Sequence, residues 1–235
     1  MIKIIVSYLI LASLLNAGDL TSAYHAFQNK EYEQAFSLYK KEAEKGDPKA
    51  QSALSYFYFN GIGAQKDVNR GLFWISKAAE NGHITAQFDL GMMYLTGQHF
   101  SQDFSKALLW LEKAAETNHT EAQYNTALMY YRGDGTDHNI TKAAQYLESA
   151  AQNGHVGAQT SLGRIYMQLI KFDQAVPWLE KNAKNGDSEA AYLLGEIYCS
   201  KEEFGKAAPW TQLAIDSGNT KASILWKKYE LGKYK

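Results

Sequence analysis

Apolar residues recur along most of the chain at the spacing of one face of an α-helix. In the stretch AQFDLGMMYLTG, four residues separated by four, three and one positions share such a face: Ala86, Leu90, Met93 and Tyr94. Polar residues and glycine occupy several of the positions between them. The alanine that anchors this pattern recurs along the chain, which indicates that one helical unit is used repeatedly: Ala50, Ala86, Ala122, Ala158, Ala190 and Ala222.

The intervals between these alanines are 36 residues for the first three and 32 residues for the last two. Self-similarity at a period of 20–50 residues is the sequence signature of helical repeats, solenoids and related arrays. The sequence therefore predicts five repeats between two capping segments. We place the N-terminal cap at 18–49, the repeats at 50–85, 86–121, 122–157, 158–189 and 190–221, and a closing helix with a polar outer face at 222–235.

Each repeat contains a second predicted helix, for example Asp103–Asn118, which Asp103 can cap through its carboxylate. Its inner face carries small residues and one large ring, and glycines follow the helices at the positions where a left-handed C-terminal residue is expected. The rings, which we expect to act as wedges between helices, are Trp74, Trp110, Tyr146, Trp178 and Trp210. Pro177 and Pro209 lie near the start of the last two second helices, where proline can shorten or kink a helix.

One position of the first helix holds a small residue in every repeat: Ser55, Gly91, Ala127, Gly163 and Gly195. A glycine in the middle of a helix costs up to about 1 kcal/mol relative to alanine. Its repeated use predicts that another helix passes too close for a larger side chain.

These motifs, A-Q-x-x-L-G-x-x-Y-x-x-G followed by K-A-x-x-W-x-x-K-A-A-x-x-G, resemble the Sel1-like repeat family, a relative of the tetratricopeptide repeats. Gly61-x-Gly63 and Gly133-x-Gly135 match the loop of that family. The resemblance implies an all-α fold, a right-handed superhelical solenoid of antiparallel helix pairs. The last two repeats depart from it, because they lose four residues at the loop between their helices.

The N-terminus differs from the rest of the chain. One lysine, the apolar run Ile4–Leu15 and small residues after it predict a signal peptide at residues 1–17, cleaved after Ala17. The run is shorter than the roughly 20 apolar residues that span a bilayer. An uncleaved anchor remains an alternative, because Leu15 is larger than the residue a signal peptidase prefers there. We expect a periplasmic or secreted protein, from a bacterium by resemblance, with membrane contact only if the segment is retained.

Charge and cysteine content narrow the function further. Lys and Arg total 24 against 25 Asp and Glu, for a net charge of -1, and no long run of one sign occurs, so we expect no nucleic-acid partner. The single cysteine, Cys199, excludes an internal disulfide and is interpreted as a small buried hydrophobe.

Three histidines, His83, His119 and His155, stand 36 residues apart and raise the question of a metal site. Equivalent positions hold Asp47, Asp187 and Asn219, which are turn and N-cap residue types. Stacked helices place equivalent atoms roughly 9–10 Å apart, whereas a zinc–nitrogen bond is about 2.0–2.1 Å. We therefore predict a capping role, no metal and no cofactor.

A strip of residues lies off the core face of the first helices, at i, i+4 and i+7. Its residues are mostly aromatic and apolar in the early repeats and include charged residues in the later ones. Ser52 and Cys199 occupy two of its positions. A strip of this kind favours a partner-binding groove, although some of its rings could fill space between neighbouring helices. We assign to the groove Tyr56, Phe59, Phe88, Met92, Tyr124, Leu128, Tyr131, Arg132, Arg164, Tyr192 and Glu196.

The sequence therefore predicts an exported, monomeric, non-catalytic scaffold that binds a protein or extended peptide in a concave groove. No nucleophile elbow, zinc-peptidase or phosphate-loop motif is present. Two alternatives remain. One is a hydrolase or binding protein related to cell-wall or β-lactam chemistry, an activity associated with cysteine-rich members of the family. The other is a secreted effector that binds a host protein.

Overall fold

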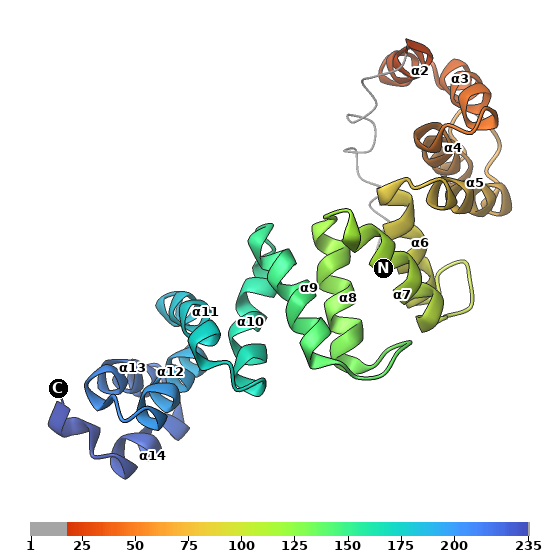
Figure 1. Cartoon of the computed structure of the whole chain (residues 1–235). Coiled ribbons are helices and arrows are strands. Elements are labelled where there is room, and N and C mark those ends of the chain that lie inside the picture. The colour runs from red at the N-terminus through yellow and green to blue at the C-terminus, as the bar shows by residue number, and fades with distance from the viewer. Residues whose placement is uncertain (1–17, 235) are drawn as a thin grey trace. The chain divides into compact units, whose positions relative to one another are not determined.

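The computed structural model describes residues 18–234, and the predicted signal segment 1–17 lies outside the described residues. The described part is all-helical (Figure 1). Its helices are α2 Gly18–Gln28, α3 Tyr32–Glu44, α4 Pro48–Asn60, α5 Val68–Glu80, α6 Ile84–Thr96, α7 Phe104–Glu116, α8 Thr120–Arg132, α9 Ile140–Gln152, α10 Val156–Gln168, α11 Phe172–Lys184, α12 Ser188–Ser200, α13 Phe204–Asp216, α14 Thr220–Lys228 and the 3-10 helix η1 Leu231–Tyr234.

The chain forms two compact units, Met1–His138 and Asn139–Lys235. Among the described residues, the first unit contains α2 to α8 and the second contains α9 to α14 with η1. Within each unit every helix packs on the one that follows it in the chain. The predicted all-α fold of consecutive helix pairs, the architecture of Sel1-like and tetratricopeptide-like solenoids, is confirmed.

The core of each unit is a seam of small and aliphatic side chains. All six anchor alanines are completely buried. A Cβ atom added to Gly91 would lie 2.7 Å from Cγ of Leu111 on α7, and one added to Gly163 would lie 2.8 Å from Cγ of Leu179 on α11. The predicted close approach at the small-residue position is therefore confirmed, and the approaching helix is the second helix of the same repeat.

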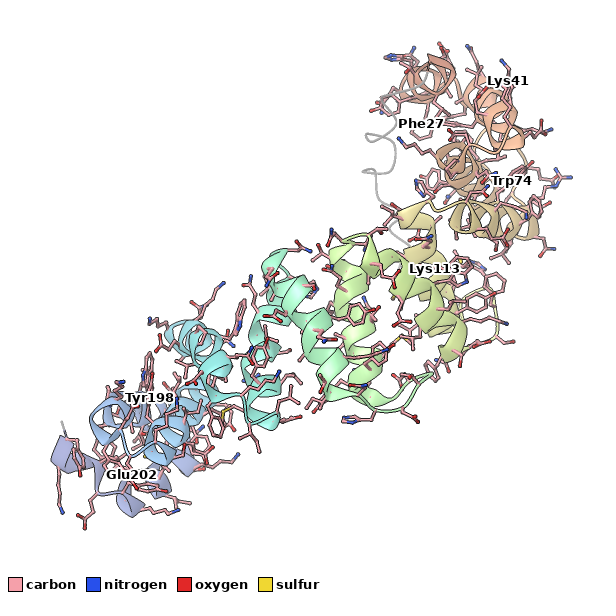
Figure 2. The ribbon with its side chains drawn as sticks, in the orientation of Figure 1. Phe27, Lys41, Trp74, Lys113, Tyr198 and Glu202 are labelled. Carbon is pink, nitrogen blue, oxygen red and sulfur yellow. The ribbon has the colours of Figure 1, made fainter. Side chains whose placement is uncertain are left out.

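The large rings of the second helices are less buried than the sequence predicts. Trp74 on α5 (Figure 2) and its equivalents Trp110, Tyr146, Trp178 and Trp210 are all half-buried. The enclosed side chain is instead the next residue in each repeat: Ile75, Leu111, Leu147, Leu179 and Thr211. In the three repeats with glycine at the small-residue position, this smaller residue contacts the glycine of the first helix.

The glutamine of the A-Q motif has a structural role that the sequence pattern did not predict. The Nε2 atom of Gln87 donates a hydrogen bond of 3.2 Å to the carbonyl of Ala79, near the end of the preceding second helix. Gln51, Gln123 and Gln159 make the same bond to Ala43, Ala115 and Ala151. The last carbonyls of a helix have no partner within it. Each glutamine therefore ties one repeat to the next, whereas α12 has Ala191 at this position.

Helix ends follow the predicted residue types. Asp67, Asp103 and Asn139 each accept a hydrogen bond from the backbone of the second helix they precede. Gly82, Gly154, Gly186 and Gly218 have φ between +82° and +93°, as predicted for the residues that follow these helices. The conformation is left-handed, and glycine adopts it without a Cβ clash.

The expectation that proline shortens the last two second helices is wrong. Pro177 and Pro209 lie inside α11 and α13, and both helices keep the 13 residues of the second helices α5, α7 and α9. Each proline therefore removes a backbone donor from the helix interior without ending the helix. The outer face of α14 is not uniformly polar, because Ile224 is 69% exposed.

The loop glycines Gly63 and Gly135 allow contact between neighbouring repeats. Both have positive φ, and a Cβ atom on either would overlap the backbone carbonyl at the start of a helix in the preceding repeat, Tyr32 or Phe104. Gly82 has a similar positive φ, but a Cβ atom there would meet nothing within 4 Å.

Replacing Gly63 with alanine should therefore destabilise the protein more than replacing Gly82. Gly82→Ala loses about 1–2 kcal/mol of unfolding free energy, the cost of a left-handed alanine. Gly63→Ala loses that amount and a further 1–3 kcal/mol, roughly, because its Cβ displaces the loop. Urea denaturation of both variants measures the difference, and equal losses would mean that the loop does not contact α3 tightly.

Asp89 on α6 is the second feature with a measurable consequence. Its Oδ2 atom is enclosed and has no hydrogen-bond partner in the protein. Burial raises the pKa of this carboxyl from 3.8 to about 7. The folded protein therefore holds a proton on Asp89 that the unfolded chain releases between pH 3.8 and pH 7.

We expect Asp89 to lower the free energy of unfolding as pH rises through this window, by about 4 kcal/mol. An asparagine at this position would carry no charge, like Asn125 at the equivalent place in α8. The substitution Asp89→Asn should therefore remove that slope and stabilise the protein at pH 7.5. Asp137→Asn, which changes an exposed carboxylate of the same unit, is the control. Thermal melts from pH 4 to pH 8 measure the effect, and parallel profiles for wild type and Asp89→Asn would refute it.

Candidate partner-binding face

The predicted strip of the first unit runs along three first helices. It consists of Tyr56 and Phe59 on α4, Phe88 and Met92 on α6, and Tyr124, Leu128, Tyr131 and Arg132 on α8. Arg132 is exposed and the others are half-buried. We call this set the aromatic strip. Its helical register differs from that of the buried anchors, because the i, i+4 and i+7 positions turn away from the seam.

Three rings of the aromatic strip pack against imidazoles. The ring of Phe88 stacks on that of His119, with centroids 4.5 Å apart and an interplanar angle of 23°. Phe59 stacks on His99 at 5.4 Å, and Tyr131 lies 5.8 Å from His138. Part of each ring is therefore covered by another side chain of the protein. This agrees with the alternative that some of these rings fill space between neighbouring helices. The half-buried state of these residues means that another part of each remains open to solvent.

Two positions in the strip's register do not reach the surface. Ser52 is 2% exposed and Cys199 is 3% exposed, so neither can contact a partner. The prediction that Cys199 is a small buried hydrophobe is confirmed. Burial raises the pKa of its thiol, and nearby Glu196 adds to the effect, so the reactive thiolate is disfavoured.

The predicted strip residues of the second unit are bound to one another or to neighbours. Arg164 Nη2 lies 2.5 Å from Asp187 Oδ2, the carboxylate that caps α12. The hydroxyl of Tyr192 donates a hydrogen bond to Glu196 one turn further along α12. Burial raises the pKa of Tyr192, with Glu196 as the next cause. These three polar groups are committed to structure inside the unit.

A small open pocket lies beside these residues. It has a volume of about 290 Å³ and is lined by residues of α10, α11, α12, α14 and the Tyr229 that follows, including Met167, Cys199 and Lys228. Lys228 and Ile224 on α14 occupy the strip's register when it is counted from Ala222, as Glu196 and Tyr192 do from Ala190. Neither residue is among the predicted groove residues, although the sixth alanine anchor, Ala222, locates both.

The three regularly spaced histidines cap helices. The Nδ1 atom of His83 accepts a hydrogen bond of 3.2 Å from the backbone N–H of Ala86. His119 and His155 make the same bond to Ala122 and Ala158, at 3.2 and 3.0 Å. The predicted capping role is confirmed. Among residues 18–234, no group of three or more His, Cys, Asp or Glu side chains has the arrangement of a metal site.

No helix among the described residues combines the length and the apolar character needed to cross a membrane. This finding concerns α2 to α14 and η1 alone.

Comparison with known proteins places this geometry in a family. The model of the Sel1 repeat matches residues 12–47, 48–83, 84–119, 120–155 and 188–219, and does not match 156–187. A search of curated protein sequences gives no match to this chain.

Two solved structures resemble the chain. A Sel1 repeat protein from Oxalobacter formigenes is 30% identical, with 86% of each chain covered and a TM-score of 0.63. The protein c5321, described as a protective antigen present in uropathogenic Escherichia coli strains and displaying an SLR fold, is 29% identical with a TM-score of 0.57. That comparison covers 84% of this chain and 44% of the antigen, so the chain spans less than half of the antigen's length.

The family model accounts for more than half of the sequence, and the matched segments begin one residue after the caps Asp47, His83 and His119. The chain belongs to the Sel1 repeat family.

Proposed function

We propose that this protein is an exported, non-catalytic scaffold that binds a protein or an extended peptide through its aromatic strip. Sel1 and tetratricopeptide-like repeats form scaffolds that are typical of protein–protein interaction. The partner-binding role of these particular residues is our assignment.

The observation that carries the proposal is the constant chemistry of one register over three helices. The position four residues after the strip's first residue is Tyr56 on α4, Met92 on α6 and Leu128 on α8, and all three are half-buried. The anchors of the seam are fully enclosed, and Tyr56 packs against the same core while part of its side chain stays open to solvent. Large half-exposed apolar side chains in one register supply the contact area that protein partners use.

Charge supports a neutral, apolar partner segment over a strongly charged one. Arg132 is the one charged residue of the aromatic strip as defined above. The charged strip residues of the second unit, Arg164 and Glu196, are engaged by Asp187 and Tyr192. We therefore place the main contact on the first unit and give Arg164, Tyr192 and Glu196 a structural role.

The chemistry of the candidate nucleophiles supports a non-catalytic role. Cys199 is buried, with its thiol pKa raised, and His83, His119 and His155 use Nδ1 to accept backbone hydrogen bonds. Sel1 repeat proteins are generally non-catalytic scaffolds. A hydrolase would need a nucleophile and a base in contact, and none of these residues serves as one.

Export is the other part of the proposal. The predicted signal segment, residues 1–17, precedes the described helix α2. Leu20, Ala23 and Ala26 of this helix are buried in the core of the first unit. A chain cleaved after Ala17 would therefore keep these buried residues.

Photo-crosslinking tests the binding face. A benzoylphenylalanine placed at Met92 or Leu128 in the producing cells should form a crosslink to a second protein, because both positions lie on the aromatic strip. The matched controls are Phe73 on α5 and Leu109 on α7, which are apolar and 54% and 50% exposed but belong to the second helices. Crosslinking only from the control positions would contradict the proposed face.

The captured partner then allows a quantitative check. Truncating a central aromatic residue of an interface often costs 2 kcal/mol or more, roughly a thirtyfold loss of affinity. We expect about this loss for Tyr124→Ala and no change for Leu109→Ala, measured by isothermal titration with purified partner. Melting curves of both variants confirm that the fold is intact.

Export predicts a specific mass for the mature protein. The chain recovered from the periplasm or the culture medium should begin at Gly18, as measured by intact-mass spectrometry. Recovery of the full chain, starting at Met1, from the cytoplasm alone would show that residues 1–17 do not direct export.

A further inference from the structure

Two neighbouring first helices of the first unit begin at a histidine cap. His83 precedes α6 and His119 precedes α8, and in each case Nδ1 is the acceptor for the N–H of an anchor alanine. A neutral imidazole can accept at Nδ1 only when its proton is on Nε2. The caps therefore require the neutral form of both side chains.

Protonation removes both favourable features of such a cap. An imidazolium carries a hydrogen on Nδ1, so it can no longer accept from the alanine N–H. Its positive charge also lies at the N-terminus of a helix, where the helix dipole disfavours cations. Acid therefore converts a stabilising cap into a destabilising group at the same position.

The surroundings of each imidazole also favour the neutral form. His83 is half-buried and faces Lys49 and Asp47 at the start of α4. Burial lowers its pKa to about 4, Lys49 contributes in the same direction and Asp47 opposes it. Burial likewise lowers the pKa of His119, while Glu121 on α8 opposes the effect. From α6, the ring of Phe88 covers one face of His119.

The chain itself provides a comparison at equivalent positions. Asp47 caps α4 and accepts from Ala50 at 2.8 Å, and Asp187 caps α12 and accepts from Ala190 at 3.1 Å. These carboxylates make the same bond with an oxygen as the acceptor in place of a ring nitrogen. Histidine is the side chain whose charge ordinarily changes between pH 5 and 8. Acid sensitivity is thus confined to helices capped by histidine.

We propose that His83 and His119 are acid-sensitive caps: as pH falls, protonation of the opened form makes the first turns of α6 and α8 open more readily. His119 connects this switch to the aromatic strip, because Phe88 rests on its ring. Loss of the cap therefore loosens one ring of the strip together with the helix start. The proposal concerns the protein alone and does not depend on the partner binding proposed above.

The sign of the pH dependence follows from the lowered pKa. Between pH 6.5 and about pH 4, an opened or unfolded His83 binds a proton that the folded protein excludes, so stability falls as pH falls. Asp89 acts in the opposite direction over nearly the same range, as described above. The two effects partly cancel in the wild type, so the caps must be observed individually.

Amide hydrogen exchange, measured by NMR on the protein at pH 7.5 and pH 5.0, observes the opening of each cap separately. The protection factor of the Ala86 amide should fall about tenfold or more at pH 5.0 relative to that of Ala50, whose cap is Asp47, and that of Ala122 should fall in the same direction. This comparison is internal to the wild-type chain and needs no variant. Protection of Ala86 and Ala122 that follows Ala50 at both pH values would overturn the proposal.

A double variant provides the second test. His83→Asn with His119→Asn keeps a capping side chain at both positions, as Asn219 does at α14, and removes the ionisation. At pH 5.0 its Ala86 amide should be protected about tenfold more than in the wild type and its Ala122 amide should also be better protected, with little difference for either at pH 7.5. His25→Asn, at an exposed position on α2, is the control. Equal loss of protection in the wild type and the double variant would exclude the caps as the cause.

Discussion

The fold depends on the close approach of two helices at a seam of small side chains. Each first helix presents an anchor alanine and, one turn later, a glycine, alanine or serine to its neighbours. At Gly91 and Gly163 there is no room for a Cβ atom beside Leu111 and Leu179. A single helix pair cannot enclose such a seam, so burial becomes complete only when pairs stack on one another. The mid-helix glycines, which cost up to about 1 kcal/mol each, are retained because they allow this contact.

Much of this seam could be predicted from the sequence. The 36-residue spacing of the alanines located the helices, and the small-residue position predicted the close contact, because both are properties of a periodic pattern. The sequence pattern could not decide whether Trp110 or Leu111 is the enclosed residue. Adjacent positions on a helix differ in direction by only about 100°, so either residue could lie on the buried face. The glutamine bonds were also missed. They depend on which carbonyls at the end of the preceding helix lie within reach of the glutamine side chain, and that becomes visible only when this helix end is in place.

The candidate site stays a prediction, and the sequence defines it less closely than it defines the fold. The strip residues on α4, α6 and α8 are half-buried or exposed, as a binding face requires. Ser52 and Cys199 of the same register are buried, and on α12 Tyr192 and Glu196 bind each other. Periodicity defines the direction in which a side chain leaves its helix. It does not define what the next helix or loop places against it, such as His119 on Phe88.

Two faces of the same helices therefore have separate roles in our proposal. The seam stabilises the fold, and the aromatic strip binds the partner. Hydrogen–deuterium exchange of the protein with and without its bound partner tests this separation most directly. The account predicts new protection along α4, α6 and α8, with α5 and α7 unchanged. New protection confined to α5 and α7, or to the second unit, would contradict it.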